Sequence, residues 1–178
     1  MVSSPDERLA SAVLAADVPQ VLAALAAGAS PDAMTPGGWP VLVAAAADGD
    51  DDAVAALLDG GARVDDRRAG HTALHAAAAT DRLDAVAVLL AAGADPRGTD
   101  ANGRTPLHLA VIEASPGMVT RLIDAAPDAV GLVDDIGRTP LHDAAVRRDP
   151  DVVRLLVSAG ADPDARDASG SRPVDLGG

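Results

Sequence analysis

The chain has no cysteine, no lysine, no phenylalanine and no tyrosine, and Trp39 is its one tryptophan. The absence of cysteine excludes a disulfide framework and a thiolate metal site. Because bulky aromatic side chains are missing, the core must be built from Ala, Leu and Val. This composition favours helices that approach closely through small side chains at their contacts.

Basic charge is also scarce. Arginine supplies all fourteen basic residues, aspartate supplies nearly all the acidic ones, and the net charge is −13. We expect no nucleic-acid partner, because affinity for nucleic acid comes largely from neutralised phosphates, and no anionic membrane surface. A basic protein surface is the partner that charge favours. A chain rich in Ala, Gly, Arg and Asp is typical of a GC-rich bacterial genome.

Targeting and membrane signals are missing from the sequence. Residues 1–13, MVSSPDERLASAV, have acids where a signal peptide needs basic residues and then an apolar run. No window approaches the ~20 apolar residues of a transmembrane helix. We therefore expect a cytoplasmic protein, and a monomer.

What the chain does contain is a repeated motif. GRTPLHLA at 103–110 recurs as GRTPLHDA at 137–144, GHTALHAA at 70–77 and GWPVLVAA at 38–45, with a fragment GSRPVDL at 170–176. The motif leucine, or its equivalent Leu9, is followed 19 residues later by the end of an apolar segment in all five cases. Length varies only between that end and the next motif. Constant spacing predicts packed elements in register, and variable spacing predicts a loop.

Each constant part contains two helical patterns. At 105–111, Thr105 can cap a first helix, Pro106 suits its first position, and Leu107, Ala110 and Val111 form one apolar face. Pro116 then starts a second helix. The following segments, such as 93–103, are rich in Gly, Asp, Pro and Asn and predict turns.

This unit of helix, turn, helix and projecting loop is about 33 residues long, and with its TPLH motif it resembles the ankyrin repeat. The resemblance implies an all-α ankyrin-repeat solenoid of helix-turn-helix units with short β-hairpin-like loops, forming a single domain over residues 1–178. We number its repeats 1 to 5 and place them at 5–34 (a polar-faced N-terminal cap), 35–66, 67–99, 100–133 and 134–166, with a partial C-terminal repeat at 167–178.

Three departures from the repeat pattern predict local differences. Repeat 2 has Pro40, Val41 and Val43 where the pattern has Thr, Pro and His. Repeat 4 ends in AAPDAVGLVDD at 125–135, without the usual Gly and with one extra residue, so its loop should differ in shape. The last repeat is incomplete, so the face of repeat 5 beside it is either poorly covered or covered by another molecule.

Two features suggest metal binding, and each has a structural interpretation. His75, His108 and His142 occupy one motif position, and stacked helices would hold them about 8–10 Å apart, too far for one zinc ion. The resemblance implies a structural role for them, bonding to loop backbone. The run DGDDD at 48–52 lacks EF-hand spacing, and there Asp51 or Asp52 can cap or precede a helix. We expect no metal and no cofactor.

No nucleophile–base pair, P-loop or dinucleotide motif stands out, so we expect a chain that is not an enzyme. The resemblance implies a protein-binding module that uses its loop tips and the exposed side of its first helices. The alternatives are a small regulatory, inhibitor or immunity-type subunit of a partner enzyme and, further off, a small enzyme or ligand-binding protein.

Carrying that surface onto this sequence gives the candidate partner-binding residues. They flank the repeated motif and are Trp39, Arg68, His71, Asn102, Arg104, Ile112, Glu113, Ile136, Arg138, Val146 and Arg147. Each has a competing interpretation: the arginines of the GRTPLH motif can be ordinary solvated residues, and Ile112 and Val146 can half-pack on their own helices. Trp39 is either an interface residue, where Trp is enriched, or a shield for repeat 2.

Overall fold

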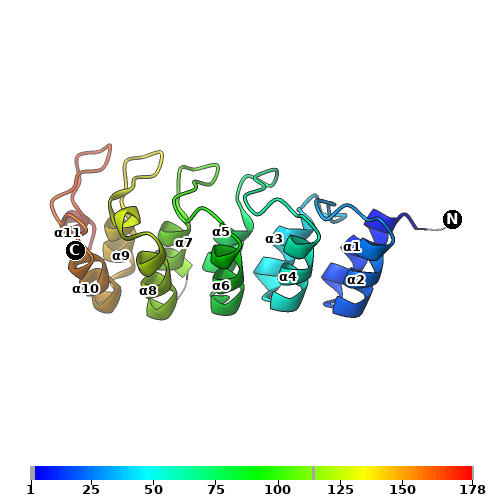
Figure 1. Cartoon of the computed structure of the whole chain (residues 1–178). Coiled ribbons are helices and arrows are strands. Elements are labelled where there is room, and N and C mark those ends of the chain that lie inside the picture. Colours follow the sequence, from blue (N-terminus) through cyan, green and yellow to red (C-terminus); the bar gives the residue numbers. More distant parts are fainter. Residues whose placement is uncertain (1–2, 114, 178) are drawn as a thin grey trace. The chain divides into compact units, whose positions relative to one another are not determined.

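The computed structural model describes residues 3–113 and 115–177. This part of the chain is helical, with one isolated antiparallel bridge between Met34 and Pro40 and no strand, so the expected β-hairpin-like loops are tight turns. The chain divides into two compact units, which are described separately. In each unit, loops project from one end of the helix pairs (Figure 1). The single-domain organisation stays a prediction.

Unit 1 comprises residues 1–77 and 82–95. Helix α1 packs against α2 and α3, α2 packs against α4, and α4 packs against α6, so that successive helix pairs stack. Helix α5 starts in unit 1 and ends among residues 78–81, which are assigned to unit 2. The helices are α1 (Pro5–Leu14), α2 (Val18–Ala26), α3 (Val41–Asp48), α4 (Asp51–Asp59), α5 (Ala73–Ala79) and α6 (Leu83–Ala91).

Unit 2 comprises residues 78–81 and 96–178. Its first helices α7 and α9 pack together, its second helices α8 and α10 pack together, and α11 covers part of α9. A 3-10 helix, η1 (Pro127–Gly131), packs on α8 in the segment of repeat 4 for which a different loop was predicted. The α-helices are α7 (Pro106–Glu113), α8 (Pro116–Ala125), α9 (Pro140–Arg147), α10 (Pro150–Ser158) and α11 (Pro173–Leu176).

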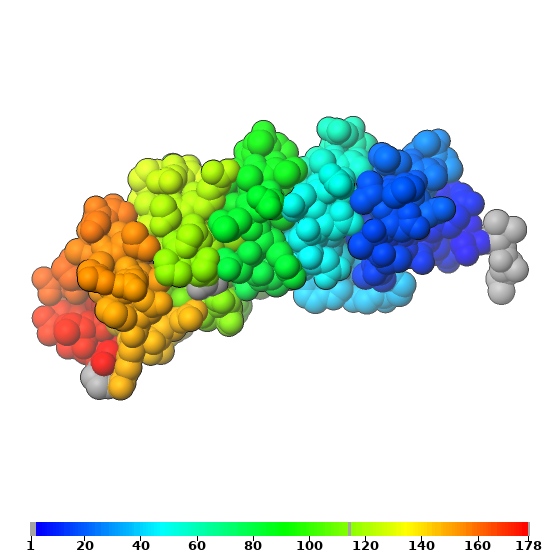
Figure 2. All heavy atoms as spheres, turned by 90° about the horizontal axis from the view of Figure 1, so that it is seen from below, coloured from blue at the N-terminus to red at the C-terminus, as the bar shows by residue number. Residues whose placement is uncertain are grey.

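Leucines at the motif position lie in the core, as their spacing predicts. Leu107 is 1% exposed, and the equivalent residues Leu9, Leu42, Leu74 and Leu141 are also buried. Most of their buried neighbours are Ala or Val, which lets the helices of each pair approach closely. Within each unit, side chains fill the space between neighbouring repeats (Figure 2).

The second helices α2, α4, α8 and α10 begin at polar caps, whereas α6 follows Arg82 without a side-chain cap. Asp17, Ser115 and Asp149 each accept a backbone N–H at the start of α2, α8 and α10. In α4 the cap is Asp50, whose Oδ1 accepts the Ala53 N–H at 3.1 Å. Asp51 and Asp52, which the sequence suggested as possible caps, occupy the first turn of α4, where negative charge is favourable.

The repeated histidines are structural, as the resemblance implied. The Thr105 N–H donates to His108 Nδ1 at 3.1 Å, and His108 Nε2–H donates to the Arg138 carbonyl at 3.0 Å. A nitrogen that accepts an N–H carries no proton, so His108 is neutral with its proton on Nε2. Burial lowers the pKa of His108 and favours the same form. The imidazole thereby ties the start of α7 to the next loop.

Threonine contributes to the same contact. The Thr105 hydroxyl, expected to cap α7, lies 2.9 Å from His108 Nδ1. At the equivalent Thr139, the hydroxyl also accepts the backbone N–H of the third residue of α9, which is a cap of the expected kind. The TPLH motif is therefore used to hold the helix start and its loop together.

Candidate functional site

A finger is the loop that leads into a first helix, and four of the finger bases are closed by one kind of turn. In it, the N–H of the first residue donates to the carbonyl of the fifth, and a side-chain oxygen of the first accepts the N–H of the fifth. The pairs are Thr35 with Trp39, Asp100 with Arg104, Asp134 with Arg138 and Asp167 with Ser171. Sequence reasoning missed these first residues, although an Asp four places before the Arg or Ser of the motif was a visible signal.

In unit 1 the fingers bring two candidate residues together. Trp39 is 45% exposed, and its ring centroid lies 5.0 Å from that of His71 with the planes 60° apart. Arg68 is anchored, because its Nη2 lies 2.5 Å from Asp66 Oδ2 and 2.7 Å from the Asp32 carbonyl oxygen. We call Trp39 and His71 the Trp39 pair.

In unit 2 the candidate arginines are held by neighbours. Arg104 binds Asp100 Oδ2 through Nε at 3.0 Å and Nη2 at 2.8 Å. Arg147 Nη1 donates to the carbonyls of Val111 and Ile112. The side chains of Arg104 and Arg147 are therefore partly engaged in bonds within the fold.

The other candidates of unit 2 differ in exposure. Ile136 is 56% exposed and Val146 is 50% exposed, so both offer apolar surface to solvent. Asn102 and Glu113 are exposed, whereas Ile112 is half-buried. The Asn102 carbonyl accepts the Asp135 N–H at 3.1 Å, and the Ile136 carbonyl accepts the Ala168 N–H at 2.9 Å. These bonds fix adjacent fingers to one another.

Asp143 is a residue that the sequence reasoning did not single out. It lies on α9 at the place of Leu109 in repeat 4, and its side chain is only 8% exposed. Its Oδ2 has no hydrogen-bond partner, and Arg138 Nη1 stands 3.8 Å from its Oδ1. Burial raises the pKa of Asp143 to about 6. The positive charge of Arg138 lowers this pKa, and the negative charge of Asp134 raises it, but burial has the largest effect. The available signal was an acid in TPLHDA where the other repeats have Leu or Ala.

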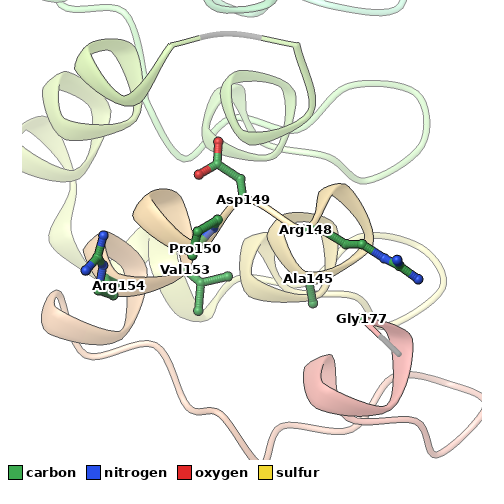
Figure 3. Close-up of a pocket in the computed structure, with 7 residues that line it drawn as sticks. All are labelled: Ala145, Arg148, Asp149, Pro150, Val153, Arg154 and Gly177. Carbon is green, nitrogen blue, oxygen red and sulfur yellow. The ribbon is translucent and has the colours of Figure 1, made fainter.

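A hollow lies at the end of unit 2, between α10 and α11 (Figure 3). Its volume is about 680 Å³, and it is lined by Ala145, Arg148, Asp149, Pro150, Val153, Arg154 and Gly177. Figure 3 shows Asp149 pointing to the side opposite Val153. The lining therefore offers few polar groups that converge on one point, unlike a typical ligand pocket.

Metal ligation and membrane spanning are two further possibilities that the structure bears on. Within residues 3–113 and 115–177, no group of three His, Asp or Glu side chains is placed to hold a metal ion. No helix in the same part of the chain combines the length and the apolar character needed to cross a membrane.

Comparison with known proteins identifies the family. A family model described as ankyrin repeats (3 copies) matches residues 9–100 and again residues 92–167. These matches cover far more than half of the chain, so the chain belongs to the ankyrin-repeat family, with an all-α helical-repeat fold. The comparison with curated proteins found no match. Ankyrin repeats are generally protein–protein interaction modules and are typically non-catalytic.

Proposed function

We propose that the chain is a non-catalytic module that binds another protein through its finger bases and the exposed side of its first helices. The observation that carries this proposal is the exposure of large apolar side chains at those positions. Trp39, Ile136 and Val146 are each 45–56% exposed, whereas the motif leucines Leu42, Leu107 and Leu141 are buried. Exposed aromatic and apolar anchors on a rigid support are typical of binding hot spots.

The surrounding bonds make this surface rigid. The turn that precedes Trp39 is closed by the Thr35 N–H donating to the Trp39 carbonyl at 2.7 Å. In unit 2, backbone bonds between fingers hold Ile136 in place. A surface that is already ordered loses little conformational entropy on binding, so more of the contact energy appears as affinity.

Charge supports a basic partner. The chain carries a net charge of −13, and a negative field raises the rate at which positively charged surfaces encounter it. We therefore expect the affinity for the partner to fall as the salt concentration is raised. The contribution of the apolar anchors to that affinity should not depend on the salt concentration.

The test is affinity capture from the native cytoplasm, followed by measured affinity for the captured protein. We expect Trp39→Ala and Ile136→Asp each to weaken binding by about tenfold or more. Val157→Asp is the matched control, because Val157 is 43% exposed on the second helix α10, outside the proposed surface. If Val157→Asp loses binding while Trp39→Ala and Ile136→Asp bind normally, the interface lies outside the proposed surface. A capture that returns no protein contradicts the function.

A further inference from the structure

The hollow at the end of unit 2 lies on a helix face that the other repeats bury. Val153 lines this hollow and is half-buried. Its counterparts on the earlier second helices are each 0% exposed and are Val21, Val54, Val86 and Val119. Ala145 also lines the hollow and is half-buried, whereas its counterpart Val111 is 2% exposed. Since α10 is the second helix that packs against α8, the register of the repeats places the hollow where a further helix would pack against α10.

Positive charge borders the hollow. Figure 3 shows Arg148 on one side of Val153 and Arg154 on the other. Arg154 is paired with Asp151. The carboxylate of Asp149 points away and caps α10 by accepting backbone N–H groups at the start of that helix. In a chain with a net charge of −13, this hollow is therefore suited to an acidic group.

Arg148 occupies a position that meets the start of the next second helix in earlier repeats. The equivalent residue in repeat 3 is Asp81, with a left-handed φ of +59° against +57° at Arg148. Asp81 Oδ1 accepts the N–H of Ser115 at 3.3 Å and its hydroxyl at 2.8 Å, and Ser115 is the N-cap residue of α8. In repeat 2, a Cβ at the equivalent Gly49 would lie 2.7 Å from Cδ of Arg82, the N-cap residue of α6. By the same register, Arg148 faces the N-cap residue of a helix that packs against α10.

We propose that the hollow binds an amphipathic α-helix of a partner protein, whose acidic N-cap residue pairs with Arg148. This helix lies along α10 and has apolar side chains three and seven residues after its N-cap. None of the residues that line the hollow belongs to the surface named in the proposed function. The hollow is therefore a second binding face, and the two proposals are independent.

The second helices of unit 2 define this pattern. The buried residues three and seven places after the N-cap are Met118 and Leu122 in α8, and Val152 and Leu156 in α10. An acid is required at the N-cap because the N-terminus of a helix carries partial positive charge, which Arg148 would repel. Aspartate offsets both charges and is among the preferred N-cap residues.

A second copy of the chain fits the hollow less well. In α2, Gln20 stands at the place of Met118 and Val152, and it lines a hollow of about 200 Å³ together with Arg8. This polar and basic face does not match the apolar, basic hollow of unit 2. Two hollows of unit 2 that met about a two-fold axis would bring the same arginines together, and like charges oppose such a contact.

The test uses the whole chain, labelled with ¹³C, and an unlabelled peptide that copies residues 149–162, acetyl-DPDVVRLLVSAGAD-amide. This segment is chosen because α10 already packs against α8 in the required way. A hydrocarbon staple on the face opposite the buried residues holds the helix, since isolated helices of this length are marginal in water. We expect the peptide to shift the methyl signals of Val153 in a saturable manner. The methyl signal of Met118, buried in α8, should stay in place.

Two chain variants test the apolar part of the face. Val153→Asp should weaken peptide binding by about tenfold or more, because it places an unpaired charge at the centre of the contact. Val133→Asp is the matched control, since Val133 is 53% exposed on the loop before α9 and does not line the hollow. It should bind the peptide normally. Circular dichroism of each variant verifies that the helices remain folded.

Exchange of the N-cap residue tests Arg148 itself. The wild-type chain should bind the Asp-capped peptide about threefold or more tightly than a Ser-capped peptide, because the ion pair is lost with serine. Arg148→Asp reproduces the contact between Asp81 and Ser115 and should therefore reverse this preference. A purely structural effect of the substitution would weaken the binding of both peptides equally.

Four outcomes would overturn the inference. They are the absence of a saturable shift at Val153, an equal shift at Met118, normal binding by folded Val153→Asp, and an unchanged N-cap preference in Arg148→Asp. Concentration-dependent shifts at Val153 in the chain alone would also overturn it, because a second copy would then occupy the face. None of these outcomes bears on the proposed function, since the peptide assay needs no captured partner.

Discussion

Trp39 and His71 join two successive fingers of unit 1 through their rings, with centroids 5.0 Å apart and planes inclined by 60°. This separation and tilt fall in the range that aromatic pairs prefer. Trp39 remains 45% exposed, so the contact covers only part of the indole and the helix core does not need it. The pair is an apolar platform fixed between two loops.

Replacing the histidine tests that platform. We expect His71→Ala to shift Trp39 fluorescence to longer wavelength, because the indole loses its ring neighbour and becomes more hydrated. Thermal unfolding should change little, since the pair lies outside the helix core. Arg67→Ala, an exposed residue of the same finger, is the control and should leave the emission unchanged. An unchanged spectrum in His71→Ala would mean that the rings are not in contact in solution.

The core leucine of the motif provides a stability test. Leu107 is 1% exposed, and we expect Leu107→Ala to lower the free energy of unfolding by ~2–5 kcal/mol, the range for a buried leucine truncation. Leu22→Ala is the comparison, because Leu22 is 53% exposed and its truncation should cost well under ~1 kcal/mol. Urea unfolding measures both. A negligible effect at Leu107 would mean that the repeat register is wrong.

The fold could be predicted because the packing of stacked helix pairs fixes the spacing of core residues along the sequence. A helix pair that stacks on the next must keep its leucines in register, so the 19-residue separations survive while loops vary in length. The structural role of His108 was implied by the resemblance, and the structure supplies the physical reason: the buried imidazole needs partners, and Thr105 lies within reach of it. The altered loop after α8 followed from a missing glycine and one extra residue.

The site was less predictable, because several acids lie within reach of each arginine. Arg104 and Arg138 occupy the same motif position, yet one pairs with Asp100 at its own finger base and the other with Asp143 on the following helix. Sequence spacing allows either choice, and three-dimensional geometry decides between them. In the same way, the contact between Trp39 and His71 depends on how two fingers lie side by side, which no single repeat encodes.

Close approach of neighbouring fingers predicts the effect of a glycine substitution. Gly137 and Gly170 occupy the same turn position with φ of +77° and +83°, so alanine is strained at both. A Cβ at Gly137 would also lie 2.9 Å from the Ala168 backbone nitrogen, whereas none of the neighbouring atoms lies within 4 Å at Gly170. We expect Gly170→Ala to cost about 1–2 kcal/mol from strain alone, and Gly137→Ala to cost more. Equal losses in thermal unfolding would show that the fingers can separate without penalty.

The buried acid of α9 makes stability depend on pH. The pKa of Asp143 is about 6 in the folded chain against an ordinary value of 3.8, chiefly because of burial. The folded state therefore holds this proton more tightly than the unfolded state. The resulting stability is fully present below pH 3.8 and is lost as the pH rises through about 6. At neutral pH the charged carboxylate opposes folding.

Replacing that carboxylate with an uncharged amide should therefore stabilise the protein at neutral pH. We expect Asp143→Asn to raise the free energy of unfolding by ~1–3 kcal/mol at pH 7, from about 1.4 kcal/mol for each pKa unit, and by little near pH 4. Asp124→Asn, which changes an exposed carboxylate on α8, should alter stability by less than ~1 kcal/mol at both values. Urea unfolding across this pH range measures the difference. A neutral-pH loss of stability in Asp143→Asn would mean that Arg138 stabilises the carboxylate more than burial opposes it.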